Sequence, residues 1–450
     1  MLTSIKQLLS LLLIASLPAF SFANLKSFQE ETELSAQPFL FKIKGSNTIG
    51  AQLAPNLVAK YLAAKGGTDI RIAPTAVANE QIVSARVDDF RVQVHVAAHG
   101  SGTGFSALSG GDADIAASSR PIKSKEKKLF KNLDMNESKR EHVIAIDGLA
   151  IIVNPNNPIN ELSIDQVGQL FAGEISNWQE LGGANQSVQL FARDNKSGTF
   201  DTFKSQVLKR GYKLSANAER FESNANLANS VLNTAGGIGF TPLATIGEGK
   251  ALRIRDSEST PLNPEHLTVA TEDYPLARRL FMYTNNSENV FVNEFITFVQ
   301  STQGQLTVSE TGFVSQNIEA LNISLDGEYP IGYQFLADHS ERLSFNFRFK
   351  PDSYDLDNKA HIDLDRLVSF MKLPQNKNRK IMLYGFSGKE SHELQGSVSS
   401  ELRVLKVKRA LKELGINASA ATGYGDINPV ATNDNDDFKQ RNHRVEVWLK

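Results

Sequence analysis

Residues 193–203 read RDNKSGTFDTF and join a short apolar run to an amphipathic pattern. The apolar run, VQLFA at 188–192, is brief and rich in β-forming residues, as is typical of a buried strand. Residues 199–208 place Phe200 and Phe203 at helical spacing. These residues therefore predict a strand that ends in a polar turn, and the turn opens a helix.

The polar turn at this junction is rich in hydrogen-bond donors. The first turn of a helix leaves backbone N–H groups without partners and carries partial positive charge, so Ser197, Gly198 and Thr199 are expected to direct amides and two hydroxyls at one point. Arg193, at the end of the strand, adds a planar fork of donors that suits two oxygens of a tetrahedral anion such as phosphate or sulfate. The plainer alternative is a serine-capped helix with an arginine nearby.

The same strand and turn pattern occurs three more times, with glycines or hydroxyls in each turn. FLFKIK leads into GSNTIG at 39–50, a β-prone run leads into HGSGTG at 99–104, and DIAASS at 114–119 ends in hydroxyls beside Arg120. In open α/β sheets, ligands collect at the carboxyl ends of the strands. The four turns are therefore expected to face one crevice of an α/β fold and to bind one oxyanion together.

Length and composition predict a soluble protein of several domains. At 450 residues the chain exceeds a single hydrophobic core, which predicts two or three domains. Charged residues at 22% and apolar residues at 41% are typical of globular domains. The net charge of -2 gives no reason to expect nucleic acid as a partner. Because the chain has no cysteine, it has neither disulfides nor thiolate metal sites.

The N-terminal residues 1–23 have the pattern of a secretory signal peptide. Lys6 precedes an apolar stretch at 8–19, and small residues surround a cleavage point near position 23. A membrane anchor would need about 20 apolar residues, whereas this stretch is shorter and contains Pro18. We therefore expect cleavage after export, and export of a cysteine-free protein favours a bacterial periplasm.

Further motifs accompany the four turns between about residue 39 and about residue 322. They are DGLAIIVNP at 147–155, LFAGEISNW at 170–178, GGIGF at 236–240 and DYPL at 273–276. With these motifs, the region resembles the periplasmic phosphate-binding protein family, the solute-binding components of phosphate ABC transporters. The resemblance implies the two-lobed, type II periplasmic-binding-protein fold, which closes on a dehydrated phosphate without metal, cofactor or catalysis.

The resemblance also assigns the phosphate ligands, turn by turn. They are Thr48 and Ile49 in the first turn, Ser101 in the second, Ser119 in the third, and Arg193, Ser197, Gly198 and Thr199 in the fourth. Two positions depart from the family pattern: Ser119 replaces an aspartate that accepts the phosphate proton in many members, and Asn195 replaces an aspartate that often braces the arginine. Because a serine can donate or accept a proton, this site is expected to exclude sulfate less strictly, and phosphate stays the expected ligand.

The C-terminal region predicts a small α/β sandwich. Apolar residues alternate at 343–347, and helical periodicity follows at 356–373. An apolar strand at 380–386, an amphipathic helix at 398–414 and a strand at 444–449 complete the pattern. Strands and helices thus alternate in this region, as they do in the N-terminal part.

We place the domain boundaries at 24–322 for the two-lobed domain, 323–340 for a linker and 341–450 for the sandwich. The sandwich resembles the OmpA-like C-terminal domain, whose family binds the diaminopimelate side chain of peptidoglycan. The matched features are Gly385, the S-x-x-R motif of Ser400 and Arg403, Gly423, Gly425, Pro429, and the run Asn442, His443, Arg444 and Val445. The resemblance implies that Arg403, with Asn442 and Arg444, contacts peptidoglycan.

One position of this second site departs from the family. Gly388 stands fifteen residues before Arg403, where the family has an aspartate. Without that carboxylate the ammonium of the ligand lacks a counter-charge, and the loss of one partner of a desolvated charge pair costs on the order of 2 to 5 kcal/mol. Glu390 can substitute only if its loop bends toward the ligand.

Other patterns in the sequence favour no further chemistry. His95 and His99 share one face of a strand, but no third metal ligand stands at a recognisable spacing. GSGTG at 100–104 differs from the G-x-G-x-x-G of dinucleotide-binding folds, and no G-x-S-x-G elbow supports an esterase. The basic run KSKEKKLFK at 123–131 is typical of a solvated helix face.

The sequence thus predicts a monomeric, non-enzymatic phosphate-binding protein in the periplasm of a Gram-negative bacterium, held near the cell wall or outer membrane by an OmpA-like domain. Its expected partners are inorganic phosphate, peptidoglycan and an inner-membrane ABC permease. One alternative is a wall-associated protein that serves adhesion or phosphate buffering without a transporter. The other is a phosphatase, for which the sequence offers neither a nucleophile with its base nor a metal cluster.

Overall fold

The computed structural model describes residues 39–450 apart from 89, 132, 258, 286–287, 326–328, 391 and 435, and apart from the side chains of 393, 436 and 437. Residues Phe39–Lys450 form one compact unit. The predicted signal peptide at 1–23 lies outside the described residues. Within the described part of the chain, we find no helix that combines the length and the apolar character needed to cross a lipid bilayer.

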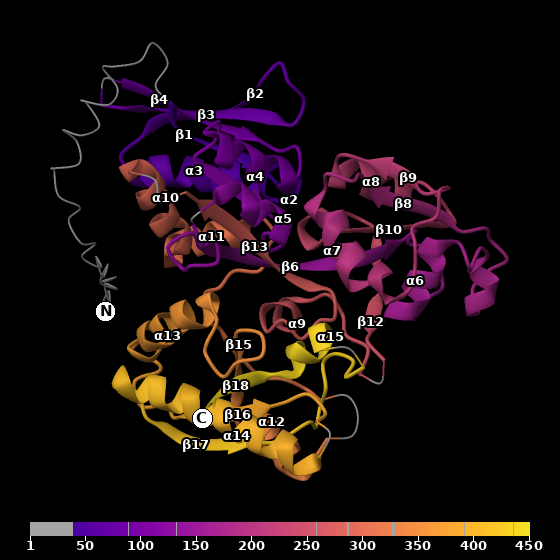
Figure 1. Ribbon diagram of the computed structural model, residues 1–450, viewed down its shortest axis with the longest axis vertical. Coiled ribbons are helices and arrows are strands. Elements are labelled where there is room, and N and C mark those ends of the chain that lie inside the picture. The colour runs from indigo at the N-terminus through magenta and orange to yellow at the C-terminus, as the bar shows by residue number, and fades with distance from the viewer. Residues whose placement is uncertain are drawn as a thin grey trace, which may run out of the picture. The chain divides into compact units, whose positions relative to one another are not determined.

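The first lobe is a mixed sheet covered by helices (Figure 1). Its elements are β1 (Phe39–Gly45), α2 (Asn47–Gly50), α3 (Leu53–Ala64), β2 (Thr68–Pro74), β3 (Glu80–Val87), β4 (Phe90–Ala97), α4 (Ser101–Gly110), β5 (Ile115–Ser118), α5 (Ser124–Lys127), α10 (Val290–Gln300) and α11 (Thr302–Glu310). The strand order is β2-β3-β4-β1-β5, and β1 runs parallel to both β4 and β5. The turns that follow these three parallel strands therefore share one edge of the sheet.

The core of this lobe joins distant parts of the sequence. Phe41 of β1 packs on Phe295 of α10 with a ring-centroid distance of 5.0 Å, and Tyr61 of α3 packs on the same ring at 5.5 Å. Aromatic pairs of this kind bury a large apolar area. Residues that follow the second lobe in the sequence, such as those of α10, therefore pack in the core of the first lobe.

Two crossing strands connect the lobes. β6 (Glu141–Val153) pairs along its first half with β13 (Ala277–Thr284) and along its second half with strands of the second lobe. β13 pairs in turn with β5 of the first lobe. Almost every residue of β6 is buried, which explains why its sequence is apolar without alternation. Asp147 is a charged residue that is fully buried in this strand, and it faces Arg278 of β13 in the antiparallel register.

The second lobe has the same alternating architecture. Its elements are β7 (Glu161–Ser163), α6 (Ile164–Ala172), β8 (Gln189–Arg193), α7 (Gly198–Gln206), β9 (Glu219–Phe221), α8 (Asn224–Leu232), β10 (Gly237–Pro242), β11 (Lys250–Ala251), β12 (Arg253–Arg255) and α9 (His266–Ala270). The strand predicted at 188–192 is β8, and the helix predicted at 199–208 is α7. Phe203 of α7 stacks on Phe240 of β10 at 4.1 Å and thereby fixes the helix on the sheet.

The C-terminal domain is a separate mixed sheet with helices. Its elements are β14 (Ala320–Leu321), α12 (Ile331–His339), β15 (Glu341–Arg348), α13 (Asn358–Met371), β16 (Ile381–Phe386), α14 (Glu393–Glu413), β17 (Ala418–Gly423), α15 (Asp436–Lys439) and β18 (Arg444–Leu449). The strand order is β14-β15-β18-β16-β17. Helices and strands alternate in both domains, which confirms the predicted α/β class.

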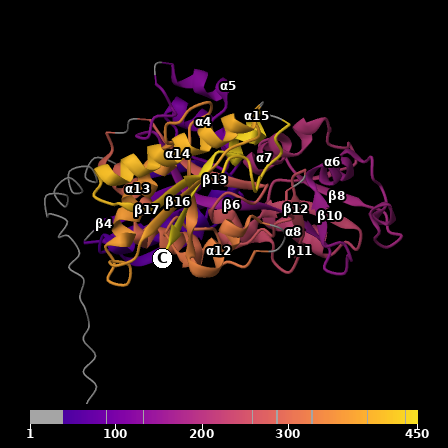
Figure 2. The same ribbon diagram turned by 90° about the horizontal axis from the view of Figure 1, so that it is seen from below.

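Helices cover both faces of this C-terminal sheet. Leu383 of β16 packs with Val404 of α14, whereas the neighbouring Met382 packs with Tyr333 of α12. Successive residues of a strand point to opposite faces, so α14 and α12 lie on opposite sides of the sheet (Figure 2). α12 lies within the segment 323–340, which the sequence analysis assigns to a linker, and its apolar side chains pack on the sheet.

Candidate oxyanion site

Three of the predicted turns open helices at the ends of parallel strands: α2 follows β1, α4 follows β4, and α7 follows β8. Across the two lobes, the hydroxyl oxygens of Thr48 and Thr199 lie 2.9 Å apart. The fourth turn, after β5, places the Ser119 hydroxyl 3.5 Å from that of Ser101. The structure thus brings together the hydroxyls of Thr48, Ser101, Ser119 and Thr199, which we call the hydroxyl cluster.

Two glycines allow the lobes to approach one another at this cluster. A Cβ atom at Gly198 would lie 2.1 Å from the Ser101 Oγ and 2.4 Å from the Ser119 Oγ, too close for any real contact. Gly100 has a φ of +115°, and a Cβ atom there would lie 2.3 Å from the Lys196 carbonyl oxygen. Glycine is therefore required at both positions.

The predicted ligands are almost completely buried. The exposed fraction is 5% for Thr48 and at most 2% for Ser101, Ser119, Arg193, Ser197 and Thr199. Buried hydroxyls need partners, and Ser197 has one because its Oγ accepts a hydrogen bond from the Phe200 N–H at 3.3 Å, which caps α7. Ile49 is buried and apolar. Only its backbone N–H, in the first turn of α2, can serve an anion.

The guanidinium of Arg193 lies against the beginning of α8. Its Nε donates to the Phe221 carbonyl at 3.0 Å, and its terminal nitrogens donate to the Glu222 carbonyl and the Asn224 Oδ1. Burial lowers the pKa of Arg193 to about 10, and the nearby charge of Arg278 acts in the same direction. Arg193 is thus joined to the hydroxyl cluster through Asn224, whose Nδ2 donates to the Thr48 Oγ1 at 3.4 Å.

Arg278 contacts the hydroxyl cluster directly, and the sequence analysis missed it. It donates through Nη1 to the Thr199 Oγ1 at 3.1 Å and through Nη2 to the Thr48 Oγ1 at 3.4 Å. Asp147 holds it in place, since the Asp147 Oδ2 accepts from Nε at 2.9 Å and from Nη2 at 2.7 Å. Burial raises the pKa of Asp147, while the Arg278 guanidinium acts in the opposite direction.

Asn224 is a second residue that the sequence analysis missed. Its Nδ2 donates to the Thr48 Oγ1 at 3.4 Å, and its backbone N–H donates to the Asn47 Oδ1 at 3.5 Å. Both bonds join the second lobe to the first. A signal for this residue exists in the sequence, because Ser223 caps α8 and so marks a further helix start beside the site.

The signal for Arg278 and Asp147 is weaker. Asp147 begins the motif DGLAIIVNP, whereas Arg278 stands two residues after the motif DYPL and belongs to none of the quoted motifs. A charged residue within a buried apolar strand is rare unless it is paired. Asp147 and Arg278 could therefore form an ion pair. The sequence does not show, however, that the two segments lie side by side.

In the C-terminal domain, Arg403 lies on α14 against two aromatic rings. Its guanidinium is 4.9 Å from the Tyr354 ring centroid and 5.5 Å from that of Phe349, and its Nη1 donates to the Ser399 Oγ at 2.6 Å. Burial lowers the pKa of Arg403. Among the described residues Arg403 forms no ion pair, so its guanidinium keeps the capacity to pair with a carboxylate.

The other residues assigned to peptidoglycan bond within the domain. The Asn442 Oδ1 accepts from the N–H groups of Val430 and Ala431 at 2.8 and 3.0 Å. Arg444 is buried and donates to the Glu446 Oε1 at 3.1 Å. Both side chains therefore serve the internal structure of the domain.

The position of the missing aspartate is filled by a lysine side chain. A Cβ atom at Gly388 would lie 2.3 Å from the Lys439 Cγ. The Lys439 ammonium forms an ion pair of 2.9 Å with Glu390. Glu390 is thus engaged with Lys439 and does not replace the missing carboxylate in this structure.

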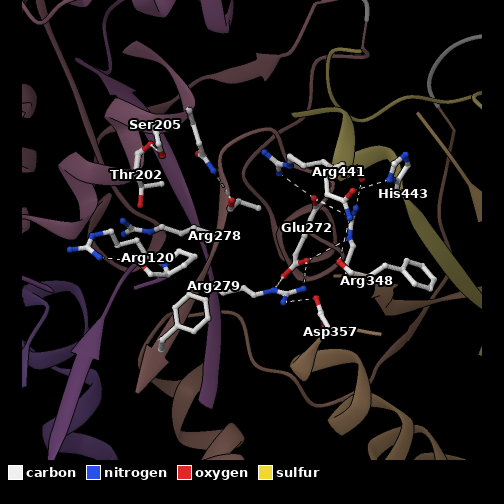
Figure 3. Close-up of a pocket in the computed structure, with 16 residues that line it drawn as sticks. Arg120, Thr202, Ser205, Glu272, Arg278, Arg279, Arg348, Asp357, Arg441 and His443 are labelled. Atoms are coloured by element: carbon white, nitrogen blue, oxygen red, sulfur yellow. Dashed lines mark hydrogen bonds and ion pairs between the residues drawn. The ribbon is translucent and has the colours of Figure 1, made fainter. Parts of the chain in front are cut away.

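A cavity of about 310 Å³ lies where the second lobe, β13 and the C-terminal domain meet (Figure 3). Five arginines line it: Arg120, Arg278, Arg279, Arg348 and Arg441. They are already bonded; for example, Arg279 pairs with Glu272 at 2.5 Å and with Asp357 at 2.7 Å. Arg348 and Arg441 of the C-terminal domain bond to the segment 272–275, as in the contacts of Arg348 with Asp273 and of Arg441 with the Tyr274 carbonyl, and so join the two domains.

Comparisons with known proteins match both domains. Residues 54–303 match the PBP superfamily domain, and residues 348–443 match the OmpA family. The phosphate-binding protein PstS of Staphylococcus aureus (strain USA300) is 29% identical over 238 residues, which cover 50% of this chain and 71% of that protein. These matches confirm the two resemblances inferred from the sequence.

Two solved structures are also similar to part of this chain. An ABC-type phosphate transport receptor from Vibrio cholerae is 25% identical, covers 61% of this chain and 99% of its own, and has a TM-score of 0.46. PstS from Borrelia burgdorferi is 22% identical, covers 61% of this chain and 98% of its own, and has a TM-score of 0.40. Because the superfamily match spans more than half of the 450 residues, the chain belongs to the PBP superfamily.

Proposed function

We propose that the protein binds inorganic phosphate between its two lobes, in the bacterial cell envelope. The main observation behind this proposal is the hydroxyl cluster. Its hydroxyls come from turns of both lobes and lie next to Arg278. Arg278 donates to one hydroxyl of each lobe, Thr199 and Thr48. The names of the relatives, which refer to phosphate binding and phosphate transport, support the same ligand.

The arrangement suggests how phosphate would be held. The cluster hydroxyls and the amides at the helix starts replace the hydration shell of the anion, and Arg278 with Arg193 supplies positive charge. The lobes contact each other at Thr48 and Thr199, so closure removes water from the bound anion. Hydrogen bonds and charge interactions are stronger in such a dry, less polar site. The protein binds its ligand and does not convert it.

We propose that the protein lies near the cell wall, and the match of residues 348–443 to the OmpA family supports this location. We propose that it is a monomer in the periplasm of a Gram-negative bacterium and that it delivers phosphate to an ABC permease of the inner membrane. Support comes from the signal-peptide pattern at 1–23 and from the OmpA match at 348–443. The two-domain chain would then store or present phosphate close to the wall.

Isothermal titration with phosphate tests the binding function. We expect one phosphate per chain and a loss of affinity of about tenfold or more in Thr199→Val, because the variant keeps the shape but removes a donor of the buried site. Thr297→Val is the matched control, since Thr297 is an exposed helical threonine of α10. If the protein takes up no phosphate, the proposed function is wrong.

Sedimentation with purified peptidoglycan tests the wall association. We propose that Arg403 carries this contact through a ligand carboxylate, and we expect Arg403→Gln to remove the protein from the pellet. Arg409→Gln is the control, because Arg409 lies on the same helix and is exposed, with Glu413 as its ion-pair partner at 3.6 Å. Equal sedimentation of both variants would exclude Arg403 as the contact.

A further inference from the structure

The C-terminal domain contacts the first lobe through the start of α13. The Asn358 Nδ2 donates to the Asn136 carbonyl at 2.8 Å and to the Glu141 Oε1 at 3.0 Å. Glu141 begins β6, and its Oε2 accepts from the Tyr283 hydroxyl near the end of β13 at 2.9 Å. Tyr283 also pairs with β5 of the first lobe. The start of α13 is therefore fixed to the first-lobe end of the crossing strands.

The middle of α13 adds a second contact on the same side. The Arg366 Nη1 donates to the Gln316 Oε1 at 3.0 Å. The backbone N–H of Gln316 donates in turn to the Oε1 of Gln305, a buried residue of α11 in the first lobe, at 2.7 Å. The chain also runs directly from α11 to β14 of the C-terminal sheet. Side chains and backbone thus link this domain to the first lobe.

The same domain contacts the second lobe at a different place. The Thr432 N–H donates to the Asp256 Oδ2 at 3.0 Å, and Asp256 pairs with Arg210 at 2.7 Å. The Phe438 ring of α15 lies over the Arg210 guanidinium, 4.1 Å from it. Only 2% of the Asp256 side chain and 11% of the Arg210 side chain are exposed. Arg210 ends the 3-10 turn that follows α7, the helix that carries Thr199.

These two links lie on either side of the hinge between the lobes. β6 and β13 cross from one lobe to the other, so opening rotates the lobes about these strands. The C-terminal sheet and its helices form one packed body, which cannot follow both lobes at once. A hydrogen bond is lost once its donor and acceptor are more than about 3.5 Å apart. Opening must therefore break the weaker of the two links.

We propose that the C-terminal domain braces the hinge: it favours the closed arrangement of the lobes and slows the release of bound phosphate. The brace consists of Asn358 and Arg366 on the side of the first lobe and of Thr432 and Phe438 on the side of the second lobe. The free energy of the weaker link adds to the cost of opening, with or without a ligand. The effect on release rests on the proposed phosphate-binding function, whereas the effect on the lobes does not.

The double variant Asn358→Ala/Phe438→Ala weakens both links and so weakens whichever one breaks on opening. It removes two hydrogen bonds on one side and a cation–π contact on the other, so we expect the ratio of open to closed molecules to rise about fivefold. Asn378→Ala/Phe335→Ala is the matched control. Both of its residues are exposed in the same domain, and the Phe335 ring stacks on His339 of its own helix.

The distance between the lobes tests the brace without any phosphate. Because the chain has no cysteine, Ala63→Cys on α3 and Asn229→Cys on α8 supply the only thiols for a pair of spin labels. Both positions are exposed, one on each lobe. Pulsed electron paramagnetic resonance of the phosphate-free protein should show more long distances in the Asn358→Ala/Phe438→Ala background. Equal distance distributions in this background, the control and the unaltered background would overturn the brace.

Stopped-flow measurement of phosphate release tests the second half of the proposal. The rate should rise about fivefold in Asn358→Ala/Phe438→Ala and stay unchanged in the control, because release follows opening. An equal rate in the double variant and in the unaltered protein would overturn the effect on release. If the unaltered protein binds no phosphate, the proposed function is wrong, and the distances between the lobes still decide whether the brace exists.

Discussion

Gly198 has no room for a side chain, although its backbone angles are ones that other residues can adopt. It begins α7 and is not among the residues with left-handed backbone angles. In Gly198→Ala the new methyl group would lie 2.1 Å from the Ser101 Oγ, so the two lobes could not close around phosphate. We expect phosphate affinity to fall about a hundredfold or more in isothermal titration, with the unfolding temperature little changed.

Gly110→Ala provides the control for this substitution. Gly110 lies in α4, and the atom nearest to a new Cβ there is the Asp112 Oδ2 at 3.9 Å. The alanine should therefore leave phosphate affinity unchanged and stabilise the helix slightly. Native affinity in Gly198→Ala would mean that the lobes do not meet at this residue in the phosphate complex.

His142 links stability to pH. Burial lowers the pKa of His142 from 6.5 to about 4. Between these values the unfolded chain binds more protons than the folded one, so stability is full above pH 6.5 and falls as the pH drops toward 4. The slope contributed by one histidine is at most about 1.4 kcal/mol per pH unit.

Urea unfolding at a series of pH values checks the prediction for His142. His142→Gln should reduce the slope of stability against pH in this window, because glutamine has no charge to gain. His361→Gln is the matched control, since His361 is exposed on α13. An identical slope in His142→Gln and in the unaltered protein would rule out His142 as the source.

The segment between α9 and β13 joins the C-terminal domain to the two-lobed domain. The Asp273 carboxylate in this segment accepts from Arg342 at 2.7 Å, from Asn346 at 3.0 Å and from Arg348 at 3.2 Å, all on β15. Burial opposes ionisation of the neighbouring Glu272, but Arg279 and other cations lower its pKa to about 2. One short segment thus neutralises several buried arginines.

Removal of the Asp273 charge is expected to weaken this junction. Asp273→Asn keeps the shape but leaves buried arginines without a counter-charge, which costs about 3 to 5 kcal/mol. Chemical unfolding followed by circular dichroism measures the loss, and Asp365→Asn, an exposed position of α13, is the control. A loss below about 1 kcal/mol would show that water reaches these arginines.

The whole molecule is expected to be more stable when phosphate is bound. The lobes contact each other through Thr48 and Thr199 and through the His99–Glu222 pair at 3.2 Å, so the closed form is the one that holds the ligand. At a phosphate concentration of 100 times Kd, binding to the folded form alone adds about 2.7 kcal/mol. Scanning calorimetry should show an unfolding temperature that rises with phosphate and does not rise with chloride at equal ionic strength.

The same experiment has an internal check in Thr199→Val. This variant should need a higher phosphate concentration for the same rise in unfolding temperature, because its Kd is larger. An equal response in both proteins would place the stabilising phosphate outside the hydroxyl cluster.

The sequence alone determined the features that depend on residues close together in the chain. The end of β8 and the start of α7 follow from local periodicity and from Ser197 as a cap, and the turns at Thr48, Ser101 and Ser119 carry the same local pattern. α12 escaped prediction because it is a short helix whose apolar face is only Tyr333, Leu336 and Ala337. A helix this short is stabilised mainly by the sheet that covers its apolar face, and the local sequence does not show that sheet.

Only the tertiary structure decided that Arg278 and Asp147 belong to the site. The two residues stand 131 positions apart, and the antiparallel register of β6 and β13 makes them partners. A shift of one residue in that register would turn each side chain to the opposite face. Packing of both lobes sets the register, so a short stretch of sequence cannot encode it. The sequence therefore predicted the donors of the turns, and the crossing strands supplied the arginine that joins them.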